Sequence, residues 1–211
     1  MIYFISGTDT DVGKSVATGF LARRFAALGK RVITQKLVQT GCRGISEDIL
    51  THRKIMGVSL FPEDTDFTTC ADVFDFPASP HLSAAMQGRV IDPDAIAARS
   101  RILQSRYDVV LLEGAGGLMV PLSEDFLTID YAKKFAPKTY LVASSKLGGL
   151  NHALLSLEAC AAAGLEVVGV VYNTFAAAPG EIEKSTADFL KKYLSKKFPS
   201  AEFLTMGKID F

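Results

Sequence analysis

The sequence has no tryptophan and no excess of charge of either sign. Its 23 lysine and arginine residues balance 23 aspartate and glutamate residues, and no run of five like charges occurs. Proteins that bind nucleic acid or an anionic membrane surface usually carry clustered positive charge. We therefore expect neither nucleic acid nor membrane as a partner.

Long hydrophobic runs and paired cysteines are also missing. The longest apolar stretches, residues 159–165 and 167–172, are far shorter than the roughly 20 residues of a transmembrane helix. The N-terminal residues show no signal-peptide pattern. Three cysteines without a Cys-x-x-Cys spacing are typical of a reducing compartment. These absences predict a cytoplasmic protein.

Two further kinds of site are not indicated. His52 and His81 have no partner at metal-ligand spacing, and no Cys/His cluster points to zinc. No nucleophile-elbow pattern marks a Ser/His/Asp triad. We expect these two histidines to be structural or exposed.

What the sequence does have is a regular alternation of strand-like and helix-like segments within 211 residues, which we interpret as one domain, residues 1–211. Continuous apolar runs such as residues 109–112 are typical of parallel strands covered by helices on both faces. The fold class is therefore α/β. The predicted strands are Ile2–Ser6, Arg31–Lys36, Asp108–Glu113, Thr139–Ala143, Val167–Tyr172 and Glu202–Thr205.

The breaks between these segments are marked by proline and glycine. Ser79 and Asp92 each precede a proline, which predicts two helix starts, and Gly88 and Gly164 follow predicted helix ends. The only long irregular stretch is Gly57–Thr69, before a possible extra strand around Cys70–Phe76. Loops of this length are often functional.

The segment Gly7–Ser15 has the composition and position of a phosphate-binding loop. It follows the first strand, and a helix is predicted over Val16–Leu28. Backbone N–H groups at such a helix start can surround phosphate oxygens, while Lys14 adds a positive charge and the Ser15 hydroxyl can ligate Mg²⁺. The alternative is a glycine-rich turn without a ligand.

Charged residues end two of the predicted strands. Glu113 ends the third strand and precedes a glycine-rich run, and Lys36 ends the second strand. The carboxyl ends of parallel strands line the ligand crevice, so both side chains are candidates for an anion and metal site. Strand-end salt bridges or solvated charges are the alternatives. Asp108 begins the same strand as Glu113, at the opposite edge, and is interpreted as structural.

Three further positions stay open on the residues alone. Glu47 and Asp48 both lie near a helix start, and the sequence does not separate a first-turn acid from a metal ligand. Asn173 follows a strand, where its amide could read a base edge or stabilise a turn.

Taken together, these motifs resemble the dethiobiotin synthetase family, the ATP-dependent carboxylases of biotin synthesis. Gly7 lies six positions before Gly13, one more than in the strict phosphate-loop pattern, and this extra residue matches that family's phosphate loop. The other matching segments follow in the family's order: Lys36–Gly41, Ser46–Asp48, Ser79–His81, Glu113–Gly117, Lys146–His152 and Asn173.

The resemblance implies a homodimeric, doubly wound, mostly parallel sheet of the P-loop NTPase-like kind. It implies a reaction that converts 7,8-diaminopelargonate, CO2 or bicarbonate, and ATP into dethiobiotin, ADP and phosphate, with Mg²⁺.

The implied catalytic residues are Lys36 and Lys14, with Thr10, Lys36 and Thr40 on the substrate. The implied metal ligands are Ser15, Asp48 and Glu113. The implied nucleotide-binding residues are Asp11, Val12, Gly13, Lys14, Ser15, Val16, Asp48, Glu113, Gly114, Ala115, Gly116, Asn173 and Thr174. The family's active site lies at a dimer interface, so the segment Lys146–His152 is expected to support the partner's site.

Some positions depart from the family pattern. Leu37 stands where a proline is common, while Ser15 and Thr40 exchange one hydroxyl side chain for another. Family members usually continue past the region of Met206 with a segment that helps to enclose the adenine, so we expect a more open base pocket here.

Three other function classes share this fold. A related amidoligase usually carries a glutamine-hydrolysing domain, for which this sequence has no room. A nucleotide switch of the partitioning-ATPase type has a lysine near the start of its loop, and Gly7–Asp11 contains none. A binding-only regulatory domain does not require both Lys36 and Glu113.

Overall fold

The central element is a six-stranded parallel sheet in the order β10-β9-β8-β1-β5-β2. The computed structural model describes residues 1–175 and 180–210. The sheet strands are β1 (Ile2–Gly7), β2 (Val32–Lys36), β5 (Val109–Gly117), β8 (Lys138–Ser144), β9 (Glu166–Asn173) and β10 (Glu202–Met206). All six predicted strands are thereby present, but β5 continues past its predicted end at Glu113 to Gly117.

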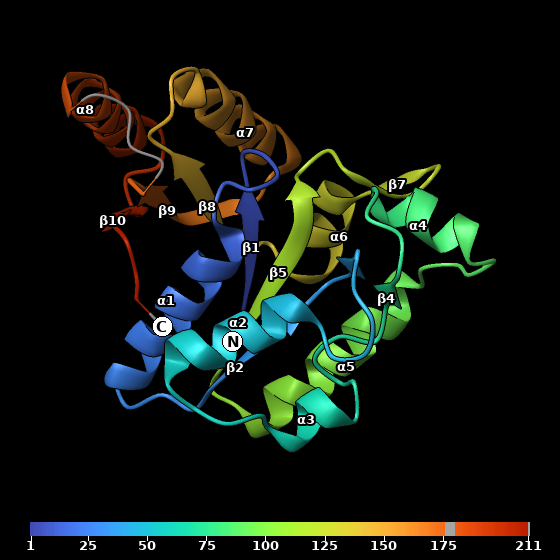
Figure 1. Cartoon of the computed structure of the whole chain (residues 1–211). Coiled ribbons are helices and arrows are strands. Elements are labelled where there is room, and N and C mark those ends of the chain that lie inside the picture. The colour runs from blue at the N-terminus through green and yellow to red at the C-terminus, as the bar shows by residue number, and fades with distance from the viewer. Residues whose placement is uncertain (176–179, 211) are drawn as a thin grey trace.

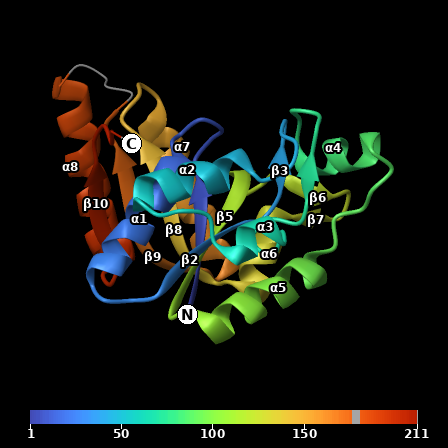
Figure 2. The ribbon, with the colours of Figure 1, turned by 60° about the horizontal axis from the view of Figure 1, so that its bottom comes forward.

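Helices cover both faces of the sheet (Figures 1 and 2). The helices are α1 (Lys14–Ala27), α2 (Glu47–Met56), α3 (Pro62–Thr65), α4 (Pro80–Met86), α5 (Pro93–Arg106), α6 (Thr128–Phe135), α7 (Gly149–Ala163) and α8 (Gly180–Lys197). Helices α1 and α2 lie on one face, and α5, α6 and α7 lie on the other, with α8 beside α7. This arrangement confirms the α/β, doubly wound expectation.

The core follows the two-residue period of the strands. Phe4 and Leu112 belong to the apolar cluster under α5, α6 and α7, whereas their neighbours Ile5 and Leu111 belong to the cluster under α1. Successive side chains of a strand point to opposite faces. Both faces of β1 and β5 are therefore buried, which explains their continuous apolar sequence.

The order of the strands places the crevice beside β1. From β1 the chain crosses to the edge strand β2 and returns to β5, and then β8, β9 and β10 follow on the other side of β1. Ligands of open α/β sheets bind at the carboxyl ends of the strands, where the winding direction changes. The phosphate loop, Lys36 and Glu113 all lie at this edge.

The predicted helix starts are present. Asp92 caps α5, because its Oδ1 accepts hydrogen bonds from the backbone N–H groups of Asp94 and Ala95, and Ser79 occupies the N-cap of α4 without a side-chain bond. Gly164 ends α7 in the left-handed conformation. Helix α1 begins at Lys14, two residues earlier than predicted.

Short pairings outside the main sheet were not predicted. The segment expected to be irregular contains the one-turn helix α3, which begins where Asp64 accepts the backbone N–H of Phe61 at 2.8 Å. The predicted extra strand is limited to β4 (Val73–Phe74), which pairs with β3 (Gln39–Thr40), and β6 (Pro121–Ser123) pairs with β7 (Phe126–Leu127). Within the described ranges, no helix is both long enough and apolar enough to cross a membrane.

Candidate functional site

The loop between β1 and α1 has the backbone of an anion-binding turn. Asp11 and Gly13 adopt left-handed φ angles of 56° and 92°, and a side chain on Gly7 would meet Val12 Cγ1 at 2.6 Å. No side chain caps α1 at Gly13, and its first turn holds no acidic residue. The N–H groups of the first turn and the positive end of the helix are thus available to an anion.

Lys14 lies over this loop. Its Nζ donates to the carbonyl oxygen of Asp9 at 2.8 Å, so the long side chain folds back toward the preceding residues. The side chain is buried, and burial lowers the pKa of Lys14. Such a lysine places one positive charge beside the helix start.

Lys36 and two carboxylates form a compact ionic cluster next to the loop. Lys36 Nζ lies 2.5 Å from Asp48 Oδ2 and 2.8 Å from Glu113 Oε1, and it donates to the carbonyl of Gly114 at 3.1 Å. Burial opposes the charge on Lys36, but Glu113 and Asp48 outweigh it and raise its pKa. Burial likewise opposes the charge on Glu113, whose pKa Lys36 and His52 hold far below its usual range. Lys36 and Glu113 are therefore both charged at neutral pH.

Secondary structure fixes the members of this cluster. Lys36 and Glu113 are opposite each other in the register of β2 and β5. Asp48 is the second residue of α2, which begins where Ser46 Oγ accepts the backbone N–H of Ile49. Glu47, one residue earlier, is exposed. The structure thus separates the two acids that the sequence could not.

The oxygen atoms of Ser15, Asp48 and Glu113 fit a hard divalent cation. Ser15 Oγ lies 2.6 Å from Asp48 Oδ1 and 3.0 Å from Glu113 Oε1. Hydroxyl and carboxylate oxygens are the ligands that Mg²⁺ takes, together with water and phosphate oxygens. Within residues 1–175 and 180–210, no cluster of three His, Cys, Asp or Glu side chains could hold a metal. A metal at this edge would therefore need Ser15 or a phosphate as an additional ligand.

A cavity of about 460 Å³ contains most of the predicted site residues. Its lining includes Thr10, Asp11, Gly13, Lys14, Ser15, Val16, Lys36, Thr40, Asp48, Glu113, Ala115 and Gly116. A neighbouring cavity of about 530 Å³ shares Thr10, Thr40 and Gly116 and extends to Ser79 and Pro80 at the start of α4. A second ligand can therefore lie beside the first.

The remaining predicted residues lie behind or beside the loop. Val12 is buried in the core under α1, and Gly114 contributes its carbonyl to Lys36. Asn173 Nδ2 donates to the Val12 carbonyl at 3.0 Å, and its Oδ1 accepts the backbone N–H of Phe175. Thr174 N–H donates to the Met206 carbonyl, which joins the ends of β9 and β10. Asn173 therefore supports the loop through this hydrogen bond and does not line the cavity.

The polar side chains packed behind the cluster were not predicted from the sequence. His52 is fully buried, in accord with a structural role, but its Nε2 lies 2.7 Å from Glu113 Oε2. Arg53 and Asp64 form a second buried ion pair. The position of His52, four residues after Asp48 on one helix, is the signal that places both on the same face.

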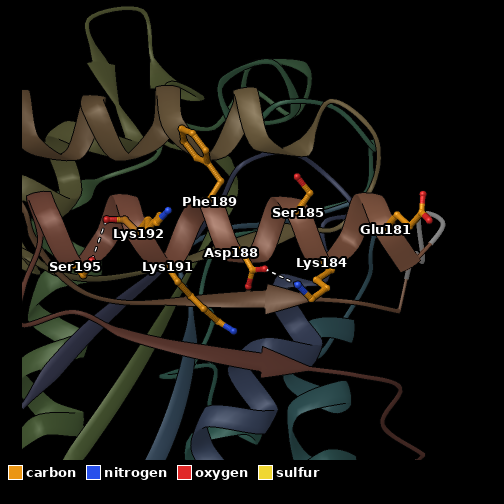
Figure 3. Close-up of a pocket in the computed structure, with 8 residues that line it drawn as sticks. All are labelled: Glu181, Lys184, Ser185, Asp188, Phe189, Lys191, Lys192 and Ser195. Atoms are coloured by element: carbon orange, nitrogen blue, oxygen red, sulfur yellow. Dashed lines mark hydrogen bonds and ion pairs between the residues drawn. The ribbon is translucent and has the colours of Figure 1, made fainter.

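A separate groove of about 980 Å³ lies along α8, lined by residues such as Lys184, Asp188 and Phe189 (Figure 3). It includes none of the predicted site residues. Lys184 and Asp188 form an exposed ion pair across one turn of this helix.

Comparisons with known proteins agree with this geometry. A family model described as an AAA domain matches residues 2–200. The pNOB8 ParA structure bound to nonspecific DNA superimposes with a TM-score of 0.58 at 13% identity, covering 99% of this chain and 85% of that chain, a likeness of fold alone. The fold and the loop thus define a P-loop nucleotide-binding protein of the AAA-domain family.

Two relatives of known name narrow the family further. The chain is 47% identical over 207 residues to the ATP-dependent dethiobiotin synthetase BioD 2 of Haemophilus ducreyi, with 98% of each chain covered. It is 49% identical over 207 residues to the ATP-dependent dethiobiotin synthetase BioD of Chlorobaculum tepidum, with 96% of this chain and 87% of the relative covered. The chain belongs to the dethiobiotin synthetase family of ATP-dependent cyclo-ligases in biotin biosynthesis. The partitioning-ATPase and amidoligase alternatives are not favoured.

Proposed function

We propose that this chain closes the ureido ring of dethiobiotin from 7,8-diaminopelargonate and CO2, using ATP. The observation that carries the assignment is the meeting of Lys14, Lys36 and the Asp48/Glu113 pair at one sheet edge, beside a second cavity. Phosphoryl transfer to an anionic acceptor depends on positioned positive charge of this kind.

The phosphate loop would bind the ATP phosphates. The uncapped first turn of α1 and the left-handed Gly13 support this role, because they leave N–H groups and a positive helix end for phosphate oxygens. Lys14 would replace its contact with the Asp9 carbonyl by a contact with phosphate. Asn173, held against Val12, would face the base from behind the loop.

Ser15, Asp48 and Glu113 would hold Mg²⁺, which when bound neutralises charge on the phosphate oxygens. Their three oxygens converge at the loop, and the two carboxylates share a single cation, Lys36. Because two acidic side chains face one lysine, an additional positive ion suits this site.

Lys36 would act on the substrate. An ammonium group has three N–H donors, and all three have acceptors in the cluster, namely Asp48, Glu113 and the Gly114 carbonyl. At least one of these contacts must be exchanged for an oxygen of the substrate. Thr10 and Thr40 line both cavities and would contact the substrate from either side of Lys36.

The reaction requires no protein nucleophile. One substrate amine attacks the carbon of CO2 and loses a proton, which gives a carbamate. A carbamate oxygen then attacks the γ-phosphorus as ADP leaves, and the second amine attacks the carbamate carbon, loses a proton and releases phosphate. Lys14 and Lys36 offset the negative charge that moves between these oxygens, so catalysis consists of positioning and charge neutralisation.

The same proposal includes a cytoplasmic homodimer. Apolar side chains at Met119, Leu147 and Leu155 are exposed, and Met119 and Leu155 line a cavity beside the phosphate loop. A second subunit would cover these side chains and bring its own Lys146–His152 segment to the site. The three cysteines are unpaired, which is typical of a reducing compartment. Sedimentation of a monomer at micromolar concentration would contradict the dimer.

The experiment that tests the function measures ADP release with ATP and Mg²⁺, with and without 7,8-diaminopelargonate and bicarbonate, followed by mass analysis of the product. Turnover that requires both additions and yields dethiobiotin is the expected result. Turnover indifferent to both, without dethiobiotin, would contradict the proposal and favour a nucleotide switch.

A further inference from the structure

A chain of buried polar side chains lies behind Glu113, on the side away from the cavity. His52 Nε2 lies 2.7 Å from Glu113 Oε2, and His52 Nδ1 lies 2.9 Å from Thr34 Oγ1. Arg53 Nη1 donates to the same Thr34 oxygen at 2.7 Å. His52, Thr34 and Glu113 have no exposed surface, so these bonds do not compete with bulk water.

The partners of Glu113 identify the donor in its contact with His52. Glu113 accepts from the Lys36 ammonium and is a carboxylate, so the hydrogen of the 2.7 Å bond belongs to His52 Nε2. Thr34 Oγ1 accepts from Arg53 Nη1 and lies 2.9 Å from the other ring nitrogen of His52, Nδ1. The ring is therefore held at both nitrogens, with Nε2 as the donor to Glu113.

The two carboxylate oxygens of Glu113 therefore have different partners. Oε2 is held by His52, whereas Oε1 faces Lys36 Nζ at 2.8 Å and Ser15 Oγ at 3.0 Å. Rotation of the carboxyl group would break the bond to His52 in a fully buried site, where a lost partner is costly. The orientation of Oε1 toward the cavity is therefore fixed from behind.

We propose that His52 is a positioning residue that fixes the Glu113 carboxylate for catalysis, through the buried sequence of hydrogen bonds Arg53–Thr34–His52–Glu113. The proposal rests on the role of Glu113 as a metal ligand in the proposed function. Side chains that donate a hydrogen bond to a metal ligand from outside the coordination shell orient that ligand in the same way.

The outer end of this series of hydrogen bonds is anchored in the segment Gly57–Thr69, which contains α3. Arg53 Nε and Nη2 donate to the two oxygens of Asp64 at 2.8 and 2.7 Å, and Asp64 also accepts from Thr69 Oγ1 at 2.8 Å. Arg53 and Asp64 are both buried. The segment around α3 thus holds the guanidinium that supplies the first hydrogen bond.

Three substitutions of His52 separate positioning from packing. In His52→Gln the amide nitrogen takes the place of Nε2 and keeps a donor for Glu113. In His52→Asn the amide nitrogen takes the place of Nδ1 and leaves Glu113 without a donor, and His52→Leu removes both contacts. Tyr140→Phe is the matched control, because it removes a buried hydroxyl that donates to Glu202 outside the cavity.

Mn²⁺ binding in the presence of a non-hydrolysable ATP analogue, followed by electron paramagnetic resonance, gives a readout apart from turnover. We expect His52→Asn and His52→Leu to weaken Mn²⁺ binding and to lower kcat by about 10- to 100-fold. His52→Gln should stay within about threefold of the parent protein, and Tyr140→Phe should be unchanged even where its Tm falls. Equal losses in the Gln, Asn and Leu variants would overturn the proposal.

Nuclear magnetic resonance of ¹⁵N-histidine protein tests the arrangement without any ligand. The protein has three histidines, His52, His81 and His152, so the variant spectrum assigns the His52 signals. An exchange-protected hydrogen on Nε2 is expected, and a ring without a hydrogen on Nε2 would overturn the proposal. If this signal is present and Glu113→Gln leaves Mn²⁺ binding unchanged, the metal-site assignment fails and the positioning role fails with it. If Glu113→Gln abolishes Mn²⁺ binding while His52→Asn does not weaken it, only the positioning role fails.

Discussion

Lys36 Nζ lies 2.8 Å from Glu113 Oε1, and the two residues are opposite each other in the register of adjacent parallel strands. The ion pair therefore depends on the sheet itself, and no loop has to close to form it. Lys36 ends β2, Glu113 follows the apolar run of β5, and α1 begins at the same edge of the sheet.

Replacing Lys36 by alanine should remove turnover while leaving nucleotide binding. The substitution deletes the cation proposed to contact the substrate, and kcat should fall by at least about 100-fold. Because two carboxylates lose their shared partner, we also expect a lower Tm for the ligand-free protein. Product formation measured by mass spectrometry, together with a fluorescent-nucleotide titration, checks both parts. Turnover near that of the parent protein would show that Lys36 has no catalytic role.

Replacing Lys14 by alanine should instead weaken nucleotide binding. Lys14 lies at the helix start with its Nζ over the loop, and loss of one charge-assisted phosphate contact costs about 10- to 100-fold in affinity. Lys138→Ala is the control, since Lys138 pairs with Glu166 at the surface and lines no part of the cavity. Equal affinities for the two variants would contradict the phosphate role.

The neighbouring acids Glu47 and Asp48 provide a matched pair. Asp48→Asn should raise the Mg²⁺ concentration needed for half-maximal turnover by about 10-fold or more, because one charged oxygen ligand is weakened. Glu47→Gln should leave it unchanged, since Glu47 is exposed on the first turn of α2. Mg²⁺ titrations of both variants test which acid is the metal ligand. An effect confined to Glu47→Gln would assign that role to Glu47 instead of Asp48.

The buried pair of Arg53 and Asp64 should matter for stability. Asp64→Ala leaves a buried guanidinium without its carboxylate, and breaking such a pair typically costs about 3–5 kcal/mol. Urea unfolding followed by circular dichroism measures the loss. Asp94→Ala, which breaks the exposed pair with Lys134, is the control and should leave the unfolding midpoint nearly unchanged.

Stability should fall in alkaline solution. Burial raises the pKa of Cys70, Cys160 and Tyr131 to about 12 each. Above pH 9, the ordinary value for a thiol, the unfolded chain releases protons that the folded chain keeps, so the free energy of unfolding decreases with rising pH. The stabilisation is complete below pH 9 and is lost as the pH approaches the pKa in the folded state. Free energies of unfolding from urea titrations at neutral and alkaline pH should differ by on the order of 2 kcal/mol, and Cys160→Ala should reduce the difference.

The fold and the front of the site were predictable because they depend on strand ends. Lys36 ends β2 and Glu113 follows the apolar run of β5, and a parallel sheet brings such positions to one edge. The contact between His52 and Glu113 depends on how α2 lies over β2, which no periodicity reports. The pair Arg53 and Asp64 spans a segment without a repeating pattern, and the two-residue strands β3 and β4 are too short for alternation to show.

Helix α1 has no capping side chain, so ligand binding completes this helix. A helix without a side chain at its start gains the absent acceptor only when phosphate oxygens take that place, so the nucleotide is itself the cap of α1. Nucleotide binding should then slow backbone amide hydrogen exchange most in the first turn of this helix, and less in the sheet. Inorganic phosphate, which has the same oxygens but no base, should produce part of that protection by itself.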